Sequence, residues 1–344
     1  MKKLESQKQF FKDLFSNSAF PGHGVRVNLA PGPEEINILT HGSIEDRAQL
    51  GRKKFLLDCE YAGPAGSIGD DRVPMLQAWS GTEVFAAAFG CKVHRPQDNA
   101  PFALPVVSDA GEADKLKEPD IYSGPLGEIF KLADRLVELC GTGYPVRICD
   151  IQSPFDIAAL IWKKETFFLA LVESPDAVHR LLKKVTKTMI GFIRAFRDRY
   201  KDVCLVHHPD LWMPPELGIC LSEDDIGSIS SRCFEEFCLP CLQQLSVEFG
   251  GISMHSCANS QHQWDGFLKL SGIRYLNLSH PPTDLGVSIE KFSGKAVLVP
   301  GGKEARECVS LAKPDTRFFF CFSAESVEKA REMTKEIKRL CKRQ

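Results

Sequence analysis

The sequence predicts an α/β fold of the (β/α)8 TIM-barrel type. From residue 71 onward, short apolar runs suited to buried strands alternate with longer runs in which apolar residues recur at helical spacing. Such alternation is typical of parallel sheets, and this many units favours a closed barrel over an open sheet. The length of 344 residues is within the range that barrels reach with insertions. We therefore expect one barrel domain over residues 71–344 and an N-terminal helical and loop extension over residues 1–70.

The extension is predicted to begin with one amphipathic helix. Phe10, Phe11, Leu14 and Phe15 recur at helical spacing among lysines, which indicates a helix docked on the barrel rather than a membrane anchor. Glycine and proline are frequent at residues 21–24, 31–33 and 63–66, which predicts loops there.

The first half of the barrel region supplies three predicted strands, over residues 72–76, 145–150 and 203–206. Helices are expected over residues 82–89, 126–140, 154–173 in two segments, and 175–200. Gly141 stands at a typical helix stop, and Ser174 and Pro175 suit a cap and a first turn. The second half is expected to begin a helix at residues 222–225, where acids favour a helix start. Further predicted elements are strands at 251–257, 273–277, 296–299 and 318–321, and helices at 289–292, 303–311 and 325–341.

Charge and composition limit the classes of partner. The formal net charge of −2 gives no basic excess of the kind that nucleic acids or membrane surfaces attract. No apolar run approaches a membrane span, and the first residues are charged, which predicts a soluble, cytoplasmic protein acting on small molecules or another protein. The 13 cysteines are an odd number scattered along a long chain, so reduced thiols are expected.

Three residues at strand ends are candidate metal ligands. His255 and Cys257 end the strand predicted at 251–257, and Cys321 ends the strand at 318–321. The carboxyl ends of barrel strands open onto one face, so these side chains are able to converge on one zinc ion. Three protein ligands leave a fourth position open, as in catalytic zinc sites. The alternative is that His255 bonds a backbone group and the two cysteines fill core space.

Polar residues at two other strand ends are candidates for the pocket. The strand at 203–206 leads directly into His207 and His208, and the strand at 145–150 ends in Asp150. His207 and Asp150 are the candidate catalytic residues, by proton transfer or by orienting a substrate or a ligand. The alternatives are that the histidines pack their loop and that Asp150 caps a helix. The expected substrate-binding residues are His208, Asp210, Trp212 and Asn259.

Several motifs in order resemble the uroporphyrinogen decarboxylase superfamily, whose fold is a (β/α) barrel. The matching runs are residues 222–226, 234–240 and 255–259, with support from residues 150–156 and 174–179. Together they cover residues 70–335.

The superfamily has two main branches, and the resemblance is closer to the second. True decarboxylases remove carboxyl groups from a tetrapyrrole without a cofactor and carry an R-Q-A-G-R motif near the N-terminus, which we do not find. The second branch contains cobalamin-dependent methyltransferases, whose zinc ligands lie in an H-x-C motif and a later cysteine. These are matched by His255, Cys257 and Cys321. Ala258 departs from the glycine that this branch usually has.

The resemblance implies a zinc-dependent methyltransferase. It would move a methyl group between a corrinoid (cobalamin), free or on a partner protein, and a thiol or a methylated small molecule. Zinc deprotonates a bound thiol at neutral pH, and two cysteines and one histidine leave the thiolate nucleophilic. The alternatives are decarboxylation of a tetrapyrrole or smaller carboxylate, and a barrel that binds a tetrapyrrole or corrinoid without turning it over. The sequence indicates neither the methyl donor, the acceptor nor the oligomeric state.

Overall fold

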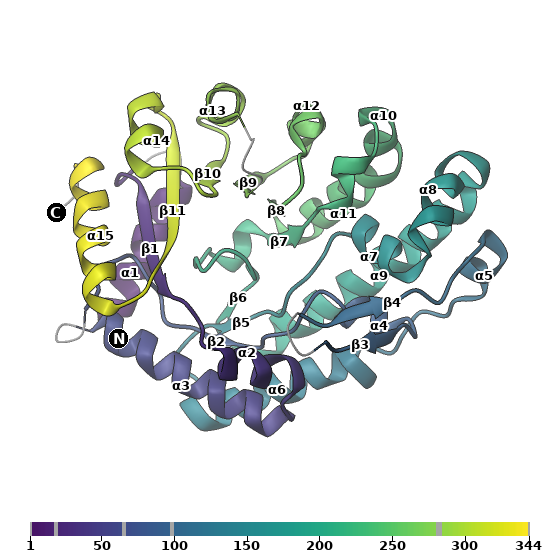
Figure 1. Ribbon diagram of the computed structural model, residues 1–344, viewed down its shortest axis with the longest axis horizontal. Helices are drawn as coiled ribbons and strands as arrows, with labels where there is room; N and C mark the ends of the chain where they lie inside the picture. Colours follow the sequence, from purple (N-terminus) through teal and green to yellow (C-terminus); the bar gives the residue numbers. More distant parts are fainter. Residues whose placement is uncertain (1, 17–19, 64–66, 97–99, 280–283, 343–344) are drawn as a thin grey trace.

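The computed structural model describes residues 2–16, 20–63, 67–96, 100–279 and 284–342. Its strands follow one another around the centre of the molecule, with helices outside them (Figure 1). One six-stranded parallel sheet has the order β1-β11-β10-β9-β8-β7, and a three-stranded parallel sheet has the order β2-β5-β6. The strands of the larger sheet are β1 (Gly24–Leu29), β7 (Ile219–Ser222), β8 (Ile252–Ser256), β9 (Ile273–Leu278), β10 (Val297–Pro300) and β11 (Arg317–Ala324). Those of the smaller are β2 (Leu76–Gln77), β5 (Val146–Arg147) and β6 (Val203–Cys204).

Hydrogen bonds outside the ladders join the two sheets at both edges. On one side, the Cys220 N–H of β7 donates to the Leu205 carbonyl just after β6, at 3.0 Å. On the other side, Asp71 N donates to the Val25 carbonyl at 2.8 Å, and carboxylates accept the remaining bonds: Asp71 Oδ2 accepts from Val25 N at 2.9 Å and Asp70 Oδ2 from Val27 N at 3.0 Å. The predicted barrel fold is therefore confirmed, with side chains completing its seam.

Helices surround the strands as the alternation predicts. In the first half of the barrel these are α4 (Val84–Ala88), α5 (Ala110–Lys115), α6 (Gly124–Cys140), α7 (Pro154–Ile161), α8 (Lys164–Glu173) and α9 (Pro175–Arg199). In the second half they are α10 (Ser231–Cys233), α11 (Leu239–Phe249), α12 (Trp264–Phe267), α13 (Leu285–Phe292), α14 (Ala305–Leu311) and α15 (Val327–Leu340). An antiparallel hairpin of β3 (Lys92–His94) and β4 (Phe102–Leu104) lies in the proline-rich stretch after α4.

The N-terminal region contains more structure than predicted. The docked helix is confirmed as α1 (Lys2–Phe15): Phe11 and Leu14 are buried, and the Phe11 ring lies 5.6 Å from that of Phe319 in β11. The loops expected at residues 21–24 and 31–33 are largely present, but β1, which was not predicted, begins at Gly24 between them and pairs with β11. Helices α2 (Pro33–His41) and α3 (Ile44–Ala62) follow. In the loop predicted at 63–66, residues 64–66 lie outside the described residues.

Two predictions within the barrel also need correction. The strand expected at 72–76 is only Leu76–Gln77, because the preceding residues bond to β1 through the carboxylates of Asp70 and Asp71. The helix start expected at 222–225 is instead the end of strand β7, followed by a 3-10 turn over Asp225–Ser228. These acids follow strand β7, whose four residues are all buried. A strand this short, with both faces buried, shows no alternation of apolar and polar residues from which to predict it.

The barrel interior is apolar at one end and polar at the other. An apolar layer that includes Tyr275, Val297 and Phe319 packs against α1 near the amino ends of the strands. Two residues further along β9 and β11 come Asn277 and Cys321, which share the inward face of Tyr275 and Phe319 because side chains alternate. Polar groups are thus gathered at the carboxyl ends, where barrel enzymes have their active sites. No described helix is both long enough and apolar enough to cross a membrane.

Candidate active site at the carboxyl end of the barrel

A cavity of about 610 Å³ opens among these polar groups. Its lining comes from β1, from α2 and α3, and from the loops after β2, β5 and β6. Asp150, His207, His208 and Asp210 are among the lining residues, so the structure brings together four of the predicted site residues. The volume is that of a typical small-molecule site.

One wall of the cavity is a network of paired charges. Asp58 of α3 accepts from Arg26 of β1 at 2.9 Å and from Arg72 at 2.8 Å. Arg72 also donates to buried Asp70 at 2.8 Å. Burial opposes the charge on Arg26, but Asp58 and Asp210 outweigh that effect and raise its pKa. The arginines are therefore charged and largely neutralised by their neighbours, and we call these residues the charged wall.

Arg147 of β5 holds the loop that carries both histidines. It is buried and donates to the carbonyls of Val206 and Pro209, at 2.8 and 2.9 Å, and also to the His207 carbonyl. It also forms an ion pair with Asp210. Burial would raise the pKa of Asp210, but Arg147 and then Arg26 hold it below its ordinary value. Asp210 is thus an anion that fixes the loop.

His207 and Asp150 lie side by side in the opposite wall. His207 Nε2 is 3.0 Å from Ser222 Oγ and 3.4 Å from Asp150 Oδ1. Burial, followed by the neighbouring His208 and His255, lowers the pKa of His207, so its ring is neutral at pH 7. Burial, followed by the negative charges of Glu83 and Asp224, raises the pKa of Asp150 to about 7. Asp150 does not cap the helix near Pro154, because Ser153 is the cap.

His255 and Cys257 form a thiol–imidazole pair at the end of β8. His255 Nδ1 is 2.6 Å from Asn277 Oδ1, which requires the proton on Nδ1 because the amide oxygen only accepts. Nε2 then presents its lone pair, 3.3 Å from Cys257 Sγ. Partial burial, followed by Asp224 and Asp150, raises the pKa of the Cys257 thiol. Asp224 Oδ1 fixes the loop by accepting from Cys257 N at 2.6 Å.

His208 connects this pair to the cavity. Its ring centroid lies 4.2 Å from that of His255, and its side chain lines the cavity. Although part of the ring reaches solvent, burial of the rest lowers its pKa to about 4, and His255 and Arg147 add to the effect. The His208 and His255 rings thus link the cavity to Cys257.

Cys321 lies apart from this pair, against the charged wall. It is paired in register with Arg26, and Asn28 Nδ2 is 3.8 Å from its sulfur. Burial, followed by the negative charge of Asp210, raises the pKa of Cys321 to about 11. Among the described residues, no three His, Cys, Asp or Glu side chains stand close enough together to hold a metal ion.

The pair alone fits two positions of a zinc site. Two ligands of a tetrahedral zinc, one nitrogen and one sulfur, lie about 3.6 Å apart, close to the 3.3 Å between His255 Nε2 and Cys257 Sγ. A zinc-binding histidine commonly gives its other ring N–H to an oxygen, as His255 gives Nδ1–H to Asn277. Two of the three predicted ligands are therefore assembled, and the third remains a prediction.

Two predicted substrate-binding residues lie away from the cavity. Trp212 is buried in the apolar layer, where its ring packs 6.4 Å from that of Phe11. Asn259 is exposed, and its side chain accepts from Gln261 N at 3.3 Å. Neither lines the cavity described above.

Ala258 stands where the family pattern usually has glycine, and the facing residue, Gly227, leaves space for its methyl group. A Cβ on Gly227 would stand 2.9 Å from the Ala258 Cβ, closer than real contacts allow. Ala258 has no positive φ, so its own turn does not require glycine. The H-x-C loop therefore keeps its shape with alanine because the facing residue is small.

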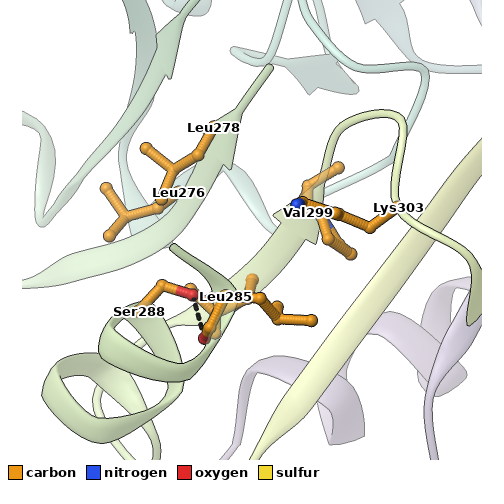
Figure 2. Close-up of a pocket in the computed structure, with 8 residues that line it drawn as sticks. Leu276, Leu278, Leu285, Ser288, Val299 and Lys303 are labelled. Atoms are coloured by element: carbon orange, nitrogen blue, oxygen red, sulfur yellow. Dashed lines mark hydrogen bonds between the residues drawn. The ribbon is translucent and has the colours of Figure 1, made fainter. Parts of the chain in front are cut away.

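A second cavity, of about 20 Å³, lies between β9, β10 and α13 (Figure 2). Half of the lining residues are leucines, and the Ser288 hydroxyl donates to the Leu285 carbonyl at 2.8 Å. It has room for about one water and offers no converging polar groups. It is not part of the active site.

Sequence reasoning missed many charged residues of the cavity because they come from the N-terminal region. Arg26, Arg47, Lys54 and Asp58 all line the cavity and all precede residue 71. A signal was present: in both Val25-Arg26-Val27 and Val146-Arg147-Ile148 an arginine interrupts an apolar run. An arginine inside such a strand must face buried partners, which marks a polar interior.

The fold and this cavity define a class of protein: a parallel (β/α) barrel with a polar site at the carboxyl ends of its strands. The family model for uroporphyrinogen decarboxylase (URO-D) matches residues 76–299, so the chain belongs to that family. A solved structure of a methyltransferase from Methanosarcina mazei is similar, with a TM-score of 0.71 and 14% sequence identity. The match covers 97% of this chain and 98% of the other, and it shows the shared fold. No curated protein matches the sequence significantly.

Proposed function

We propose that this chain is a zinc-dependent methyltransferase that moves a methyl group between a corrinoid and a thiol or methylated small molecule. The observation that carries the proposal is the His255–Cys257 pair, with Nε2 and Sγ 3.3 Å apart at the barrel rim. Family membership and the similarity to a methyltransferase fold support it. The corrinoid, free or on a partner protein, would be a substrate.

In this proposal His255 and Cys257 hold zinc, and Cys321 is the predicted third ligand. Zinc, when bound, supplies a positive charge that keeps a thiol ionised at neutral pH. Asn277 holds the His255 ring with Nε2 available, and Asp224 holds the Cys257 backbone. The cavity beside them binds the small methyl acceptor or donor, with His208 between the cavity and the pair.

Metal analysis and a methyl-transfer assay test the proposal. Protein prepared without added metal should contain stoichiometric zinc, and Cys257→Ser should lose it. Cys233→Ser, which changes another partly exposed thiol, is the matched control and should keep the metal. Zinc-loaded protein should consume methylcobalamin when a panel of small thiols is added. Absence of zinc from every preparation would overturn the proposal.

The arginines of the cavity support one alternative, decarboxylation of a tetrapyrrole or smaller carboxylate. Arg47 lines the cavity, and its Nε is buried without a hydrogen-bond partner among the described residues. An arginine of this kind is suited to a substrate carboxylate. Incubation with uroporphyrinogen separates the two functions, because loss of carboxyl groups at a useful rate would favour the decarboxylase.

A further inference from the structure

Arg47 of α3 differs from the other cations of the cavity, because the protein leaves its charge without an anion. It lines the cavity, and among the described residues no acid forms an ion pair with it. The other lysine and arginine side chains of the lining are all paired with an acid: Arg26 and Arg72 with Asp58, Arg147 with Asp210, and Lys54 with Glu35.

The guanidinium group of Arg47 is held in place but keeps donors free. Its Nη2 donates to the carbonyl of Trp79, while its Nε is buried and finds no acceptor in the part of the chain that the structure describes. The nearby acid Glu83 lies 3.9 Å from Arg95 instead. Burial lowers the pKa of Arg47, although the acids around it work in the opposite direction. A partly buried cation without an anion is costly, so we expect a ligand to supply the negative charge.

Helix α3 separates Arg47 from the charged wall. Arg47, Gly51, Phe55 and Asp58 follow one another at helical spacing, and all four line the cavity. At a rise of about 1.5 Å per residue, Arg47 and Asp58 are about 16 Å apart along the helix. The stretch between them is apolar, because Gly51 and the buried Phe55 lie there and Leu132 of α6 also contributes to the lining. The cavity therefore offers one free cation beside an apolar surface.

This arrangement favours a carboxylate over other anions. The planar fork of an arginine binds the two oxygens of a carboxylate side by side. A phosphate group carries more negative charge, and the cations that could balance it, Lys54 and the arginines of the charged wall, already have acid partners.

We propose that the small molecule bound in the cavity carries a carboxylate held by Arg47 and an apolar segment that lies against Phe55 and Leu132. The inference rests on the proposed function for the fate of this molecule: in methyl transfer the carboxylate is retained and serves to position the substrate. Binding itself requires neither a metal nor a corrinoid, so it is testable separately.

The first test measures binding to the protein as purified. Of the four tryptophans, all of which the structure describes, only Trp79 lines the cavity, so its fluorescence reports occupancy. Hexanoate should bind saturably and about 10–100-fold more tightly than hexanol, which has the same chain without the charge. Hexyl phosphate should bind more weakly than hexanoate. Trp79→Phe should lose the signal. Equal affinity for hexanoate and hexanol, no saturable binding of hexanoate, or tighter binding of hexyl phosphate would overturn the inference.

Variants of α3 assign the binding to Arg47. Arg47→Gln should weaken hexanoate binding about 10–100-fold and leave hexanol binding within about twofold. Arg47→Lys keeps the charge without the fork and should be intermediate. Arg52→Gln, the same change at an exposed arginine of the same helix, should bind hexanoate as wild type does. Circular dichroism checks that each variant folds. Unchanged hexanoate affinity in a folded Arg47→Gln protein would overturn the inference.

A methyl-transfer assay separates this inference from the proposed function. Mercaptopropionate and mercaptopropanol are both thiols and differ in the charged group. With methylcobalamin as donor, Arg47→Gln should raise the KM for the acid about 10-fold or more and leave the KM for the alcohol unchanged. Equal KM values for the two thiols in wild type would overturn the inference and leave the methyltransferase standing. Hexanoate binding that depends on Arg47, together with no methyl transfer to any thiol, would uphold the inference and count against the proposed function.

Discussion

Two sides of the barrel mouth differ in how their polar groups are satisfied. The charged wall, from β1 and α3, pairs its arginines with Asp58, Asp70 and Asp210 inside the protein. The other side, from the ends of β5 to β9, carries neutral imidazoles, one thiol and Asp150; among the described residues, Asp150 Oδ1 and His207 Nδ1 have no hydrogen-bond partner. The charged groups of the charged wall therefore bond to one another. The other side has hydrogen-bonding atoms left for a ligand.

This difference separates structural from functional polarity. Buried ion pairs that compensate each other fix loops but offer little to a substrate. Neutral donors and an unpaired acid cost stability and are retained where chemistry needs them. Substitutions on the charged wall should therefore change mainly stability, and substitutions on the other side mainly zinc binding and pH dependence.

Arg147→Met should have the largest effect. The change removes hydrogen bonds to three loop carbonyls and leaves Asp210 without its closest cation, so we expect a loss of about 3–5 kcal/mol in the free energy of unfolding. Denaturant titration measures it. Arg135→Met, which removes exposed ion pairs, is the control and should change the free energy of unfolding far less. Equal losses for the two variants would contradict the structural role of Arg147.

Asn277→Ala should weaken zinc binding with a smaller effect on stability. Without Oδ1 the His255 ring loses the bond that fixes its tautomer, and loss of such a partner typically lowers metal affinity about 10–100-fold. Competition with a chromophoric chelator measures the affinity. Asn277→Asp retains the acceptor oxygen and should keep most of the affinity. Unchanged affinity in the alanine variant would show that the His255–Cys257 pair is not the metal site.

Asp150→Asn should make the protein more stable at neutral and alkaline pH. The folded-state pKa of Asp150, about 7, lies above its unfolded value, so wild type loses stability as pH rises from about 4 to 7. The side chain is 29% exposed, and after allowance for screening we expect a gain of about 1–2 kcal/mol for the variant at pH 8. At pH 4 the two proteins should unfold at similar denaturant concentrations. A destabilised variant at pH 8 would indicate that the Asp150 carboxylate has a stabilising partner.

The same contrast explains what the sequence could predict. Strand periodicity placed His255, Cys257 and Asp150 at the carboxyl ends of strands, because alternation and strand length are local properties. The seam between β1 and Asp70–Asp71 depends on side chains replacing a ladder, which no local pattern indicates. Trp212 follows a strand as His207 does, yet packs against α1, because loop direction depends on Arg147 and Asp210 from distant contacts. The motif predicts the three zinc ligands, but only the fold shows that, among the described residues, Cys321 does not join His255 and Cys257 in one cluster.

Lys54→Ala should have the smallest effect and marks the outer limit of the charged wall. Lys54 lines the cavity and pairs with Glu35 of α2 at 3.1 Å, with its side chain 40% exposed. An exposed ion pair of this kind contributes about 0–1 kcal/mol, so the free energy of unfolding should barely change. Raised salt should change the free energy of unfolding of the variant little and should reduce any difference from wild type, because salt screens exposed charges. A loss above about 2 kcal/mol would place Lys54 inside the compensated network with Arg26 and Arg72, and would mean that α2 is held to the barrel mouth mainly by charge.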